Sequence, residues 1–401
     1  MHGTKLGFVG LMLLASMAFG SRVWAQSSLT WIGDLPGGLQ HSETRGISGD
    51  GAKVVGYSRG VFGFEQAVSW TRSGGINAIG SLPGGSIRSS AEAVSNDGTV
   101  IGGYAESTLS GSIYVEAFRQ LTGQAMVGLG ILTNPIQFGS GIHGVSADGS
   151  MLAGVSGPEA IRWTSAEGMI GLGGLPGQPI SSNATDISAD GETIVGFAAG
   201  ASGDEPFYWT SAAGMIGIGG FGGGDGVAGA ISADGSTLVG WSTNMNGDIE
   251  AYSWTSAGGF IGFGFLPGAT RSLNWAVDVS GDGSVVVGTD CGTSPCKPFL
   301  WDATNGLRTL ENLLTNVGID VSGVELRDAA AISDDGKTIV GTGIGPGGFT
   351  EGWVVVLDGP PSAIVPAVGP FGALWLGALL AGLGYRRLGR STDDDPQLGK
   401  D

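Results

Sequence analysis

Short runs of alternating apolar and polar residues, separated by turn residues, fill most of this 401-residue chain. The stretch 184–219 shows the pattern in full. Its period-two alternation predicts four strands, over residues 184–188, 192–197, 205–209 and 215–219. Asp190-Gly191 makes a tight turn between the first two, because both residues tolerate a positive φ. Four short strands in succession predict one antiparallel four-stranded sheet.

Seven copies of this unit follow one another, each marked by an Asp-Gly turn. The turns are Asp50-Gly51, Asp97-Gly98, Asp148-Gly149, Asp190-Gly191, Asp234-Gly235, Asp282-Gly283 and Asp335-Gly336. Most follow a Ser and lead into an apolar run that ends in Gly. Their spacing of 42 to 53 residues is the size of one four-stranded propeller blade.

The first and last units are incomplete in complementary ways. The run Leu29–Gly33 matches a fourth strand without its first three, and the last unit ends on a third strand, Gly352–Leu357. A first strand that completes the last blade would close a ring and remove exposed edges. We therefore predict an all-β, seven-bladed β-propeller over residues 26–358. An open β-solenoid is the alternative, although its repeats are usually shorter.

Two local features interrupt the repeat. Leu310 to Leu314 has helical spacing within the insertion 307–320, which predicts a short helix on the rim. Cys291 and Cys296 are the two cysteines, and their closeness predicts a disulfide that staples a hairpin loop. A metal site is the alternative reading, but no further His or Cys stands nearby.

Residues 1–25 have the pattern of a secretory signal. Lys5 supplies the positive charge, residues 6–19 are the apolar core, and cleavage is expected near Ala25. An uncleaved anchor helix is the alternative. We expect an exported protein, at the cell surface or outside the cell.

The composition narrows the class of protein. A net charge of −18 repels phosphate backbones, so we expect no nucleic-acid partner. Glycine accounts for 79 residues, yet 41% of the chain is hydrophobic and the glycines recur at turns. Disordered chains lack this much apolar surface, so a packed fold is expected.

Three repeated motifs resemble those of the bacterial extracellular HAF-repeat proteins. They are Gly-x-Leu-Pro-Gly-Gly, as at Gly33–Gly38, the Ser-x-Asp-Gly turn, and an aromatic third strand such as Glu205–Trp209. The resemblance covers residues 29 to about 358 and implies an exported repeat protein without an established reaction. The turn also resembles the Asp-box of sialidases, and in both we expect a structural hairpin at the outer edge of a blade.

The C-terminal segment resembles sorting signals of the PEP-CTERM type. A linker, 359–366, ends in Val-Pro, and an apolar helix with a basic stop follows over 367–390, then an acidic tail over 391–401. Residues 367–385 as a helix would span about 28 Å, close to the hydrocarbon core of a membrane. Val-Pro lacks the following Glu-Pro of such signals. Cleavage by a sorting peptidase and a plain membrane anchor both remain open.

The family's eponymous histidine is replaced in this chain, mostly by Glu. The replacements are Gln66, Glu116, Glu159, Glu205, Glu250, Lys297 and Glu351. Glu159, Glu205 and Glu250 come from consecutive blades, and an acidic arc there would attract Ca²⁺ or a cationic ligand if it faced the axis. Solvated strand starts are the other reading. Only His41 and His143 follow the signal segment, so no nucleophile–His–acid arrangement is indicated.

Seven of the 11 tryptophans form two sets of interest. Five recur at one place in the third strand, which we read as inter-blade core on an inner strand: Trp70, Trp163, Trp209, Trp254 and Trp301. Trp241 and Trp275 break the repeat pattern, so they are candidates for a ligand surface.

These features predict a non-enzymatic binding propeller for a glycan or a protein, monomeric and held at the membrane by its C-terminal helix. A polysaccharide hydrolase or lyase that uses rim carboxylates is the first alternative. A structural matrix component is the second. No cofactor is expected beyond Ca²⁺.

Overall fold

The computed structural model describes residues 27–108, 114–132, 139–222, 224–270 and 272–359. The predicted signal segment, the C-terminal linker after Gly359, the apolar helix over 367–390 and the acidic tail lie outside these residues. Among the described helices, none is long and apolar enough to cross a membrane.

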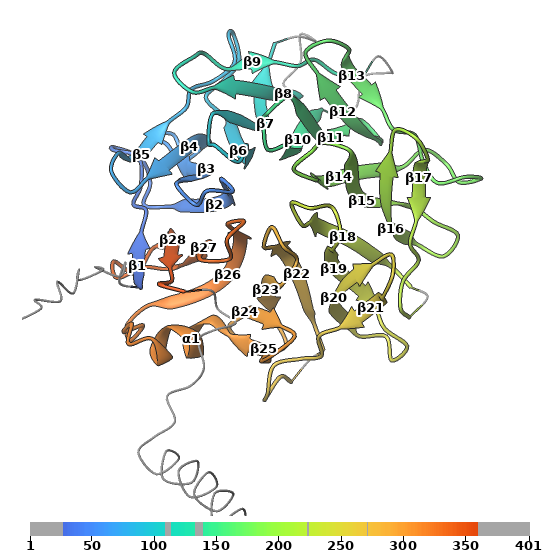
Figure 1. Cartoon of the computed structure of the whole chain (residues 1–401). Helices are drawn as coiled ribbons and strands as arrows, with labels where there is room; N and C mark the ends of the chain where they lie inside the picture. Colours follow the sequence, from blue (N-terminus) through green and yellow to red (C-terminus); the bar gives the residue numbers. More distant parts are fainter. Residues whose placement is uncertain (1–26, 109–113, 133–138, 223, 271, 360–401) are drawn as a thin grey trace, which may run out of the picture.

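The described chain forms a ring of seven antiparallel sheets (Figure 1), as predicted. Counted from the axis outward, blade 1 is β2 (Ser42–Ile47), β3 (Lys53–Arg59), β4 (Glu65–Thr71) and β5 (Gly75–Ala78); blade 2 is β6 (Ser89–Val94), β7 (Val100–Ser107), β8 (Tyr114–Leu121) and β9 (Val127–Gly128); blade 3 is β10 (Ser140–Val145), β11 (Met151–Ser156), β12 (Glu159–Thr164) and β13 (Gly168–Gly171); blade 4 is β14 (Ser182–Ile187), β15 (Thr193–Ala199), β16 (Asp204–Thr210) and β17 (Gly214–Gly217); blade 5 is β18 (Gly226–Ile231), β19 (Leu238–Thr243), β20 (Ile249–Thr255) and β21 (Gly259–Gly262); blade 6 is β22 (Asn274–Val279), β23 (Val285–Asp290), β24 (Lys297–Asp302) and β25 (Gly306–Thr309); and blade 7 is β26 (Glu325–Ile332), β27 (Thr338–Ile344), β28 (Thr350–Val356) and β1 (Ser28–Trp31).

Blade 7 closes the ring as the sequence predicted. Its outermost strand is β1 from the other end of the described chain, which pairs with β28 from Ser28↔Val356 to Trp31↔Trp353. The open-solenoid alternative is therefore wrong. Pairing with β1 covers the edge of β28, which would otherwise be unpaired.

The repeated tryptophans pack between blades, but they stand on the third strand from the axis rather than on an inner one. Each contacts the preceding blade. The Arg119 guanidinium lies 5.8 Å from the ring of Trp163, and Phe263 stacks on Trp301 with centroids 4.3 Å apart. Trp70 is 7% exposed and joins a core cluster with Val340 of blade 7. These contacts explain why the third strands repeat so regularly.

The Asp-Gly turns do not lie at the outer edges of the blades, so that expectation is wrong. Each joins the innermost strand of a blade to its second strand. In blade 4 the Ser188 hydroxyl donates to Asp190 Oδ1 (2.6 Å) and accepts the N–H of Thr193 (3.0 Å). Gly191 has a φ of 77°, which explains the requirement for glycine. The same serine contacts recur in all seven blades.

These turns also join the blades to one another near the axis. The residue between Ser and Asp in each turn takes part in a ring of backbone hydrogen bonds that runs once around the channel. The N–H→O pairs are Asp50→Asn96, Asn96→Ala147, Ala147→Ala189, Ala189→Ala233, Asp234→Gly281, Gly281→Asp334 and Asp334→Gly49. This ring forms the floor of the channel, and we call the side of the molecule that carries it the floor face.

Two smaller predictions are confirmed. Helix α1 (Leu310–Asn316) begins at Thr309, whose hydroxyl caps the N–H of Asn312, and Leu310 and Leu313 are buried. Cys291 and Cys296 form a disulfide across the loop between β23 and β24.

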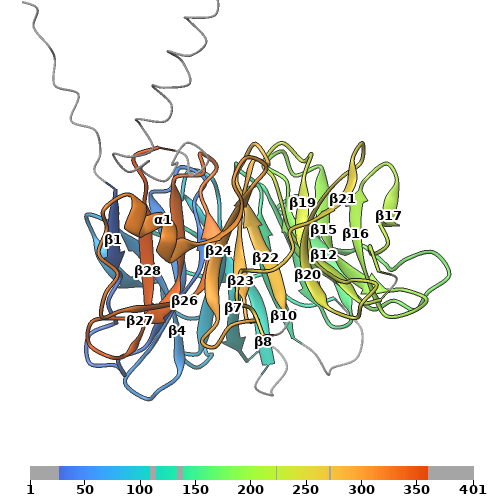
Figure 2. The ribbon, with the colours of Figure 1, turned by 90° about the horizontal axis from the view of Figure 1, so that it is seen from below.

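Both ends of the described chain lie on the floor face (Figure 2). Ser28 pairs with Val356, and the Leu357 N–H binds the carbonyl of Lys337, next to an Asp-Gly turn. The opposite side, where the innermost strands begin, is the mouth face.

Candidate functional site

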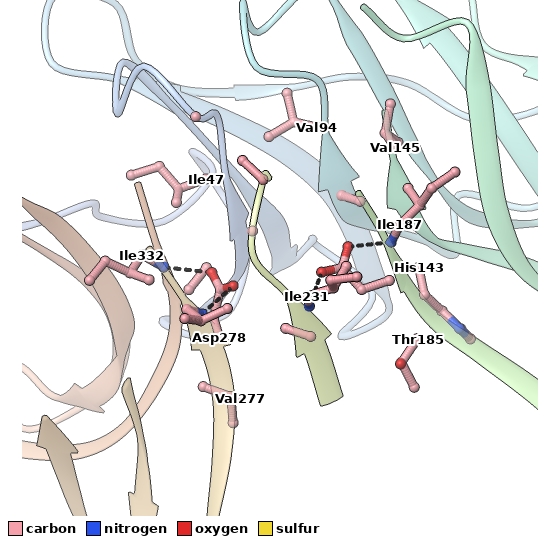
Figure 3. A pocket seen from close by; sticks show the side chains of 18 of the residues that line it. Ile47, Val94, His143, Val145, Thr185, Ile187, Ile231, Val277, Asp278 and Ile332 are labelled. Atoms are coloured by element: carbon pink, nitrogen blue, oxygen red, sulfur yellow. Dashed lines mark hydrogen bonds between the residues drawn. The ribbon is translucent and has the colours of Figure 1, made fainter. Parts of the chain in front are cut away.

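A cavity of about 230 Å³ occupies the axis of the ring, where the seven innermost strands converge (Figure 3). Every innermost strand contains a β-bulge whose extra residue lines the cavity, and β26 has a second bulge, at Arg327, that does not. These bulge residues are Arg45, Glu92, His143, Thr185, Gly229, Val277 and Ala330. Bulges are frequent next to functional sites, because they redirect a side chain. Here they place polar groups on blades 1–4 and small or aliphatic groups on blades 5–7.

Two carboxylates line the cavity below the bulges. Asp186 Oδ1 accepts the N–H of Ile187 (2.8 Å), and its Oδ2 accepts the N–H of Ile231 in the next blade (3.0 Å). Asp278 binds Val279 (2.7 Å) and, across the next boundary, Ile332 (2.7 Å) in the same way (Figure 3). Each carboxylate therefore joins two blades.

The pKa values of both carboxyls are raised by burial. The surrounding blades shield them from bulk water, although the cavity itself reaches them, and the pKa of Asp186 rises to about 7. The pKa of Asp278 rises to about 8, because the charge of Asp186 adds to the cost of burial. Backbone N–H donors oppose the rise in both cases.

The floor of the cavity is closed by a polar contact across blade 1. The Asn96 amide of blade 2 binds Asp334 of blade 7, and a Cβ added at Gly49 of blade 1 would overlap both groups. A larger residue at Gly49 would therefore have to displace the Asn96 and Asp334 side chains.

Trp241 and Trp275 lie at one level of the mouth face, on neighbouring blades. Trp275 is directly opposite Thr289 in β23, and Trp241 is directly opposite Val227 in β18. The cross-strand pairs at this level, one from each blade, are Glu43/Tyr57, Ser90/Tyr104, Gly141/Val155, Asn183/Phe197, Val227/Trp241, Trp275/Thr289 and Asp328/Thr342. We call them the mouth positions. The innermost-strand member of each pair stands two residues before the bulge residue of its blade, and neither Trp241 nor Trp275 lines the cavity itself.

Two polar atoms at the mouth positions have no hydrogen-bond partner among the described residues. They are the buried Oγ1 of Thr289 and the Oδ1 of Asn183. Thr289 faces the same side of its sheet as Trp275, and Asn183 the same side as Phe197, because directly opposite residues share a face. Both atoms are buried, so in this structure they are polar groups without a partner beneath the mouth surface.

The blade 1 side of the mouth is charged. Glu43 binds Arg45 (3.1 Å) and His41 (3.0 Å), and the Arg45 guanidinium lies 5.4 Å from the ring of Tyr57. Burial and the hydrogen bond to Glu43 raise the pKa of Tyr57, which stays a neutral donor. At the mouth positions, blades 7 and 1 carry the charged residues Asp328 and Glu43. Aromatic rings stand on blades 1, 2, 4, 5 and 6: Tyr57, Tyr104, Phe197, Trp241 and Trp275.

The structure does not place the predicted glutamate arc on the axis. Glu159, Glu205 and Glu250 stand on third strands and do not line the cavity. Each accepts, through Oε1, the N–H of a glycine that opens the following Leu-Pro-Gly loop or its equivalent. The glycine–glutamate pairs are Gly130–Glu116, Gly173–Glu159, Gly219–Glu205, Gly264–Glu250 and Gly33–Glu351. The repeat explains these carboxylates without a ligand.

Calcium binding by that arc stays a prediction. In the part of the chain that the structure describes, no three His, Cys, Asp or Glu side chains gather as ligands of a metal ion. Of the two histidines, His41 pairs with Glu43, and His143 lines the cavity with Nδ1 2.9 Å from the carbonyl oxygen of Ala184.

The sequence analysis missed Asp186 and Asp278. The signal was present in the alignment of repeats: the equivalent positions are Gly46, Ala93, Gly144, Ala230 and Ala331. Two carboxylates among small residues depart from the repeat as clearly as the two tryptophans do.

Comparisons with known proteins show the fold. No family model matches the sequence, and no curated protein matches it either. The structure is similar to an oligogalacturonate lyase from Vibrio parahaemolyticus, with 10% identity, a TM-score of 0.50, and 82% of this chain and 97% of that chain covered. Hydrazine synthase from Kuenenia stuttgartiensis (14%, TM-score 0.46, 83% and 97%) and TolB from Acinetobacter baumannii (13%, TM-score 0.44, 65% and 63%) are more distant. The match spans less than two thirds of that TolB chain. At these identities the likeness to the lyase concerns the propeller fold alone.

Proposed function

We propose that this protein is an exported binding propeller that holds a glycan at the mouth of its central channel. The observation that supports this most is the register that places Trp241 and Trp275 at the same level of the mouth. Flat aromatic faces stack on the apolar faces of sugar rings, and neither residue is required by the repeat. Asn183 and Thr289 place further polar side chains at the mouth positions, opposite Phe197 and Trp275.

The positions of the chain ends are compatible with this role. Both ends of the described chain lie on the floor face, so a tether there leaves the mouth face free for a ligand. Export by the N-terminal segment and anchoring or sorting by the C-terminal segment are parts of the same proposal.

Catalysis has less support than binding. The third-strand glutamates, which the enzyme alternative would use, each hold a loop of their own blade. The lyase of similar fold is 10% identical, which transfers no chemistry to this chain.

A glycan panel tests the proposal. We expect the full-length protein to bind at least one polysaccharide, and the variant Trp241→Ala/Trp275→Ala to bind it at least about tenfold more weakly, since stacking contributes about 1 kcal/mol per ring. Phe62→Ala is the matched control, because Phe62 is an aromatic residue, 77% exposed, outside the mouth positions. Equal binding by wild type and the double variant would contradict the proposal.

A further inference from the structure

Blade 6 departs from the repeat at the cross-strand pair next to Trp275. In blades 1 to 5 the pair at this level consists of small residues: Ser42/Ser58, Ser89/Ala105, Ser140/Ser156, Ser182/Ala198 and Gly226/Ser242. Blade 6 instead pairs Asn274 with Asp290, and both are fully buried. Five blades do without an amide and a carboxylate here, so this pair needs a separate explanation.

Asn274 joins the strands of the two mouth tryptophans. It precedes Trp275 on β22, and its Oδ1 accepts the N–H of Ala251 on β20 (2.7 Å). Ala251 is directly opposite Trp241 of β19. Asn274 therefore spans the boundary between the two blades that bear Trp241 and Trp275.

A serine makes the same contact between blades elsewhere in the ring. In blade 4 the Ser182 hydroxyl accepts the N–H of Ala160 (3.0 Å) and donates to the carbonyl of Gly173 (2.6 Å). Asn274 makes the equivalent two contacts in blade 6, and its longer side chain also donates to Asp290 Oδ2 (3.3 Å). Blade 6 thus adds to the repeat a bond between this side chain and a carboxylate.

Asp290 connects Asn274 to the disulfide loop, by which we mean residues 291–296. Its Oδ1 accepts the N–H of Gly292 (2.8 Å) in this loop. Its Oδ2 accepts the N–H of Leu266 (3.1 Å) in the connection from blade 5. A buried carboxylate with three donors is fixed in place and holds each donor group in turn.

The disulfide loop also binds the segment that leads into Trp275. The Cys291 N–H donates to the carbonyl of Leu273 (2.9 Å), and the Thr270 N–H donates to the carbonyl of Gly292 (2.7 Å). Cys291 is itself one end of the disulfide. The disulfide therefore holds a loop that contacts both Asp290 and the start of the strand that carries Trp275.

A reductant has access to this disulfide. The loop tip, Ser294 and Pro295, is exposed, and Cys291 and Cys296 are half-buried. A dithiol reduces the bond by thiol–disulfide exchange: its own two sulfurs become a disulfide, and the two cysteines each gain one electron and one proton. The opened loop has more conformations available, which weakens the contacts that Gly292 and Cys291 make.

We propose that Asn274 and Asp290 position the two mouth tryptophans relative to each other, under the control of the Cys291–Cys296 disulfide. The intact disulfide fixes the loop, the loop fixes Asp290, and Asp290 fixes Asn274 at the boundary between blades 5 and 6. Disulfides form in oxidising compartments, so in an exported protein this arrangement would be completed after export. The link is a property of the fold, and its effect on binding rests on the function proposed above.

Amide hydrogen exchange of the full-length protein tests the link without a ligand. Exchange at the Ala251 amide, on the far side of the blade boundary from the disulfide, is compared with and without dithiothreitol at one pH. We expect reduction to lower the protection of this amide by about fivefold, as for the loss of one hydrogen bond. The Ala160 amide, which Ser182 binds in the same way in blade 4, should not change. Unchanged protection at Ala251 would overturn the proposal.

Two variants separate the link from general effects of the reductant. Cys291→Ser/Cys296→Ser should show the lowered protection at Ala251 without dithiothreitol, and high protection there would contradict the proposal. Asn274→Ser introduces the residue of the repeat, which can bind the Ala251 N–H but is too short to reach Asp290. Its Ala251 amide should therefore no longer respond to reduction. A response as large as that of the wild type would show that the coupling does not pass through Asn274.

Titration with the tightest-binding polysaccharide of the glycan panel tests the consequence for binding. Reduction should raise the Kd of the wild type by about fivefold and leave that of the double cysteine variant unchanged. An unchanged Kd for the reduced wild type would overturn the positioning role. If no glycan binds at all, the proposed function fails alone, because the exchange experiment decides the link without a ligand.

Discussion

The Asp278 carboxylate accepts the backbone N–H of Ile332 across the boundary between blades 6 and 7, at 2.7 Å. Asp186 and Ile231 repeat this relationship between blades 4 and 5 at 3.0 Å. Asp278 lies on β22 together with Trp275, and Ile231 lies on β18, which pairs with the strand of Trp241. The two carboxyls also give the stability of the protein a definite dependence on pH.

The free energy of unfolding should be highest in mildly acidic solution. The folded-state pKa values of Asp186 and Asp278 are raised, so the folded protein binds more protons than the unfolded chain between about pH 4 and pH 8, and stability falls as the pH rises through this window. The turn aspartate Asp190 has a lowered pKa, because the Ser188 hydroxyl and the Glu192 N–H donate to it, and it withdraws stability only below about pH 4. Urea denaturation from pH 4.5 to pH 9 measures the curve.

The double variant Asp186→Asn/Asp278→Asn provides the check on that assignment. Its amides cannot ionise, so its curve should be nearly flat between pH 6 and pH 8, where that of the wild type descends. A descent as steep as that of the wild type would assign the pH dependence to other groups.

The serine of each Asp-Gly turn should contribute more to the free energy of unfolding than its small side chain suggests. Ser188→Ala leaves the N–H of Thr193 without its side-chain acceptor and removes the hydroxyl that binds Asp190. We expect a loss of about 1–3 kcal/mol in the free energy of unfolding, since Ser188 is 1% exposed. Ser202→Ala, at an exposed loop position, should change stability by less than about 0.5 kcal/mol in the same chemical denaturation.

Much of the fold could be predicted from the sequence because seven repeats share the same order of strands and turns. A strand that is ambiguous in one repeat is then identified from the others. Seven Asp-Gly turns in register fixed the number of blades, and the unmatched strand Leu29–Gly33 indicated the closure that β1 makes. The turns were placed on the wrong side of the blade because a hairpin motif alone does not show which of its strands faces the axis. Only the ring of backbone bonds near the floor reveals this.

The residues of the candidate site could likewise be predicted only in part from the sequence. Trp241 and Trp275 were found because they depart from the repeat. The third-strand glutamates do not line the cavity as the acidic arc requires. The sequence shows that a glutamate recurs at the position of Glu205, but it does not show that its carboxylate accepts the N–H of Gly219. Asp186 and Asp278 were missed because, in a sequence, an aspartate close to a turn is usually read as exposed to solvent. Only the bulge of the innermost strand shows that each one lines the cavity.

Gly49→Ala should disturb the floor of the channel. The added methyl group would overlap Asn96 and Asp334, which meet across this position. We expect a loss of about 1–3 kcal/mol in the free energy of unfolding, as for other overpacked sites. The variant Gly49→Ala/Asn96→Ala removes one of the two obstructing side chains and should recover part of the loss in the same denaturation experiment. No recovery would place the strain elsewhere.

The central claim is that ligands bind at the mouth rather than along the third-strand glutamates. Titration calorimetry with the tightest-binding polysaccharide of the glycan panel, on wild type, Trp275→Ala and Glu205→Gln, compares the two sites directly. The account predicts that Trp275→Ala raises the Kd by about fivefold and that folded Glu205→Gln binds as the wild type does. An unchanged Kd for Trp275→Ala together with a weakened Glu205→Gln would contradict it.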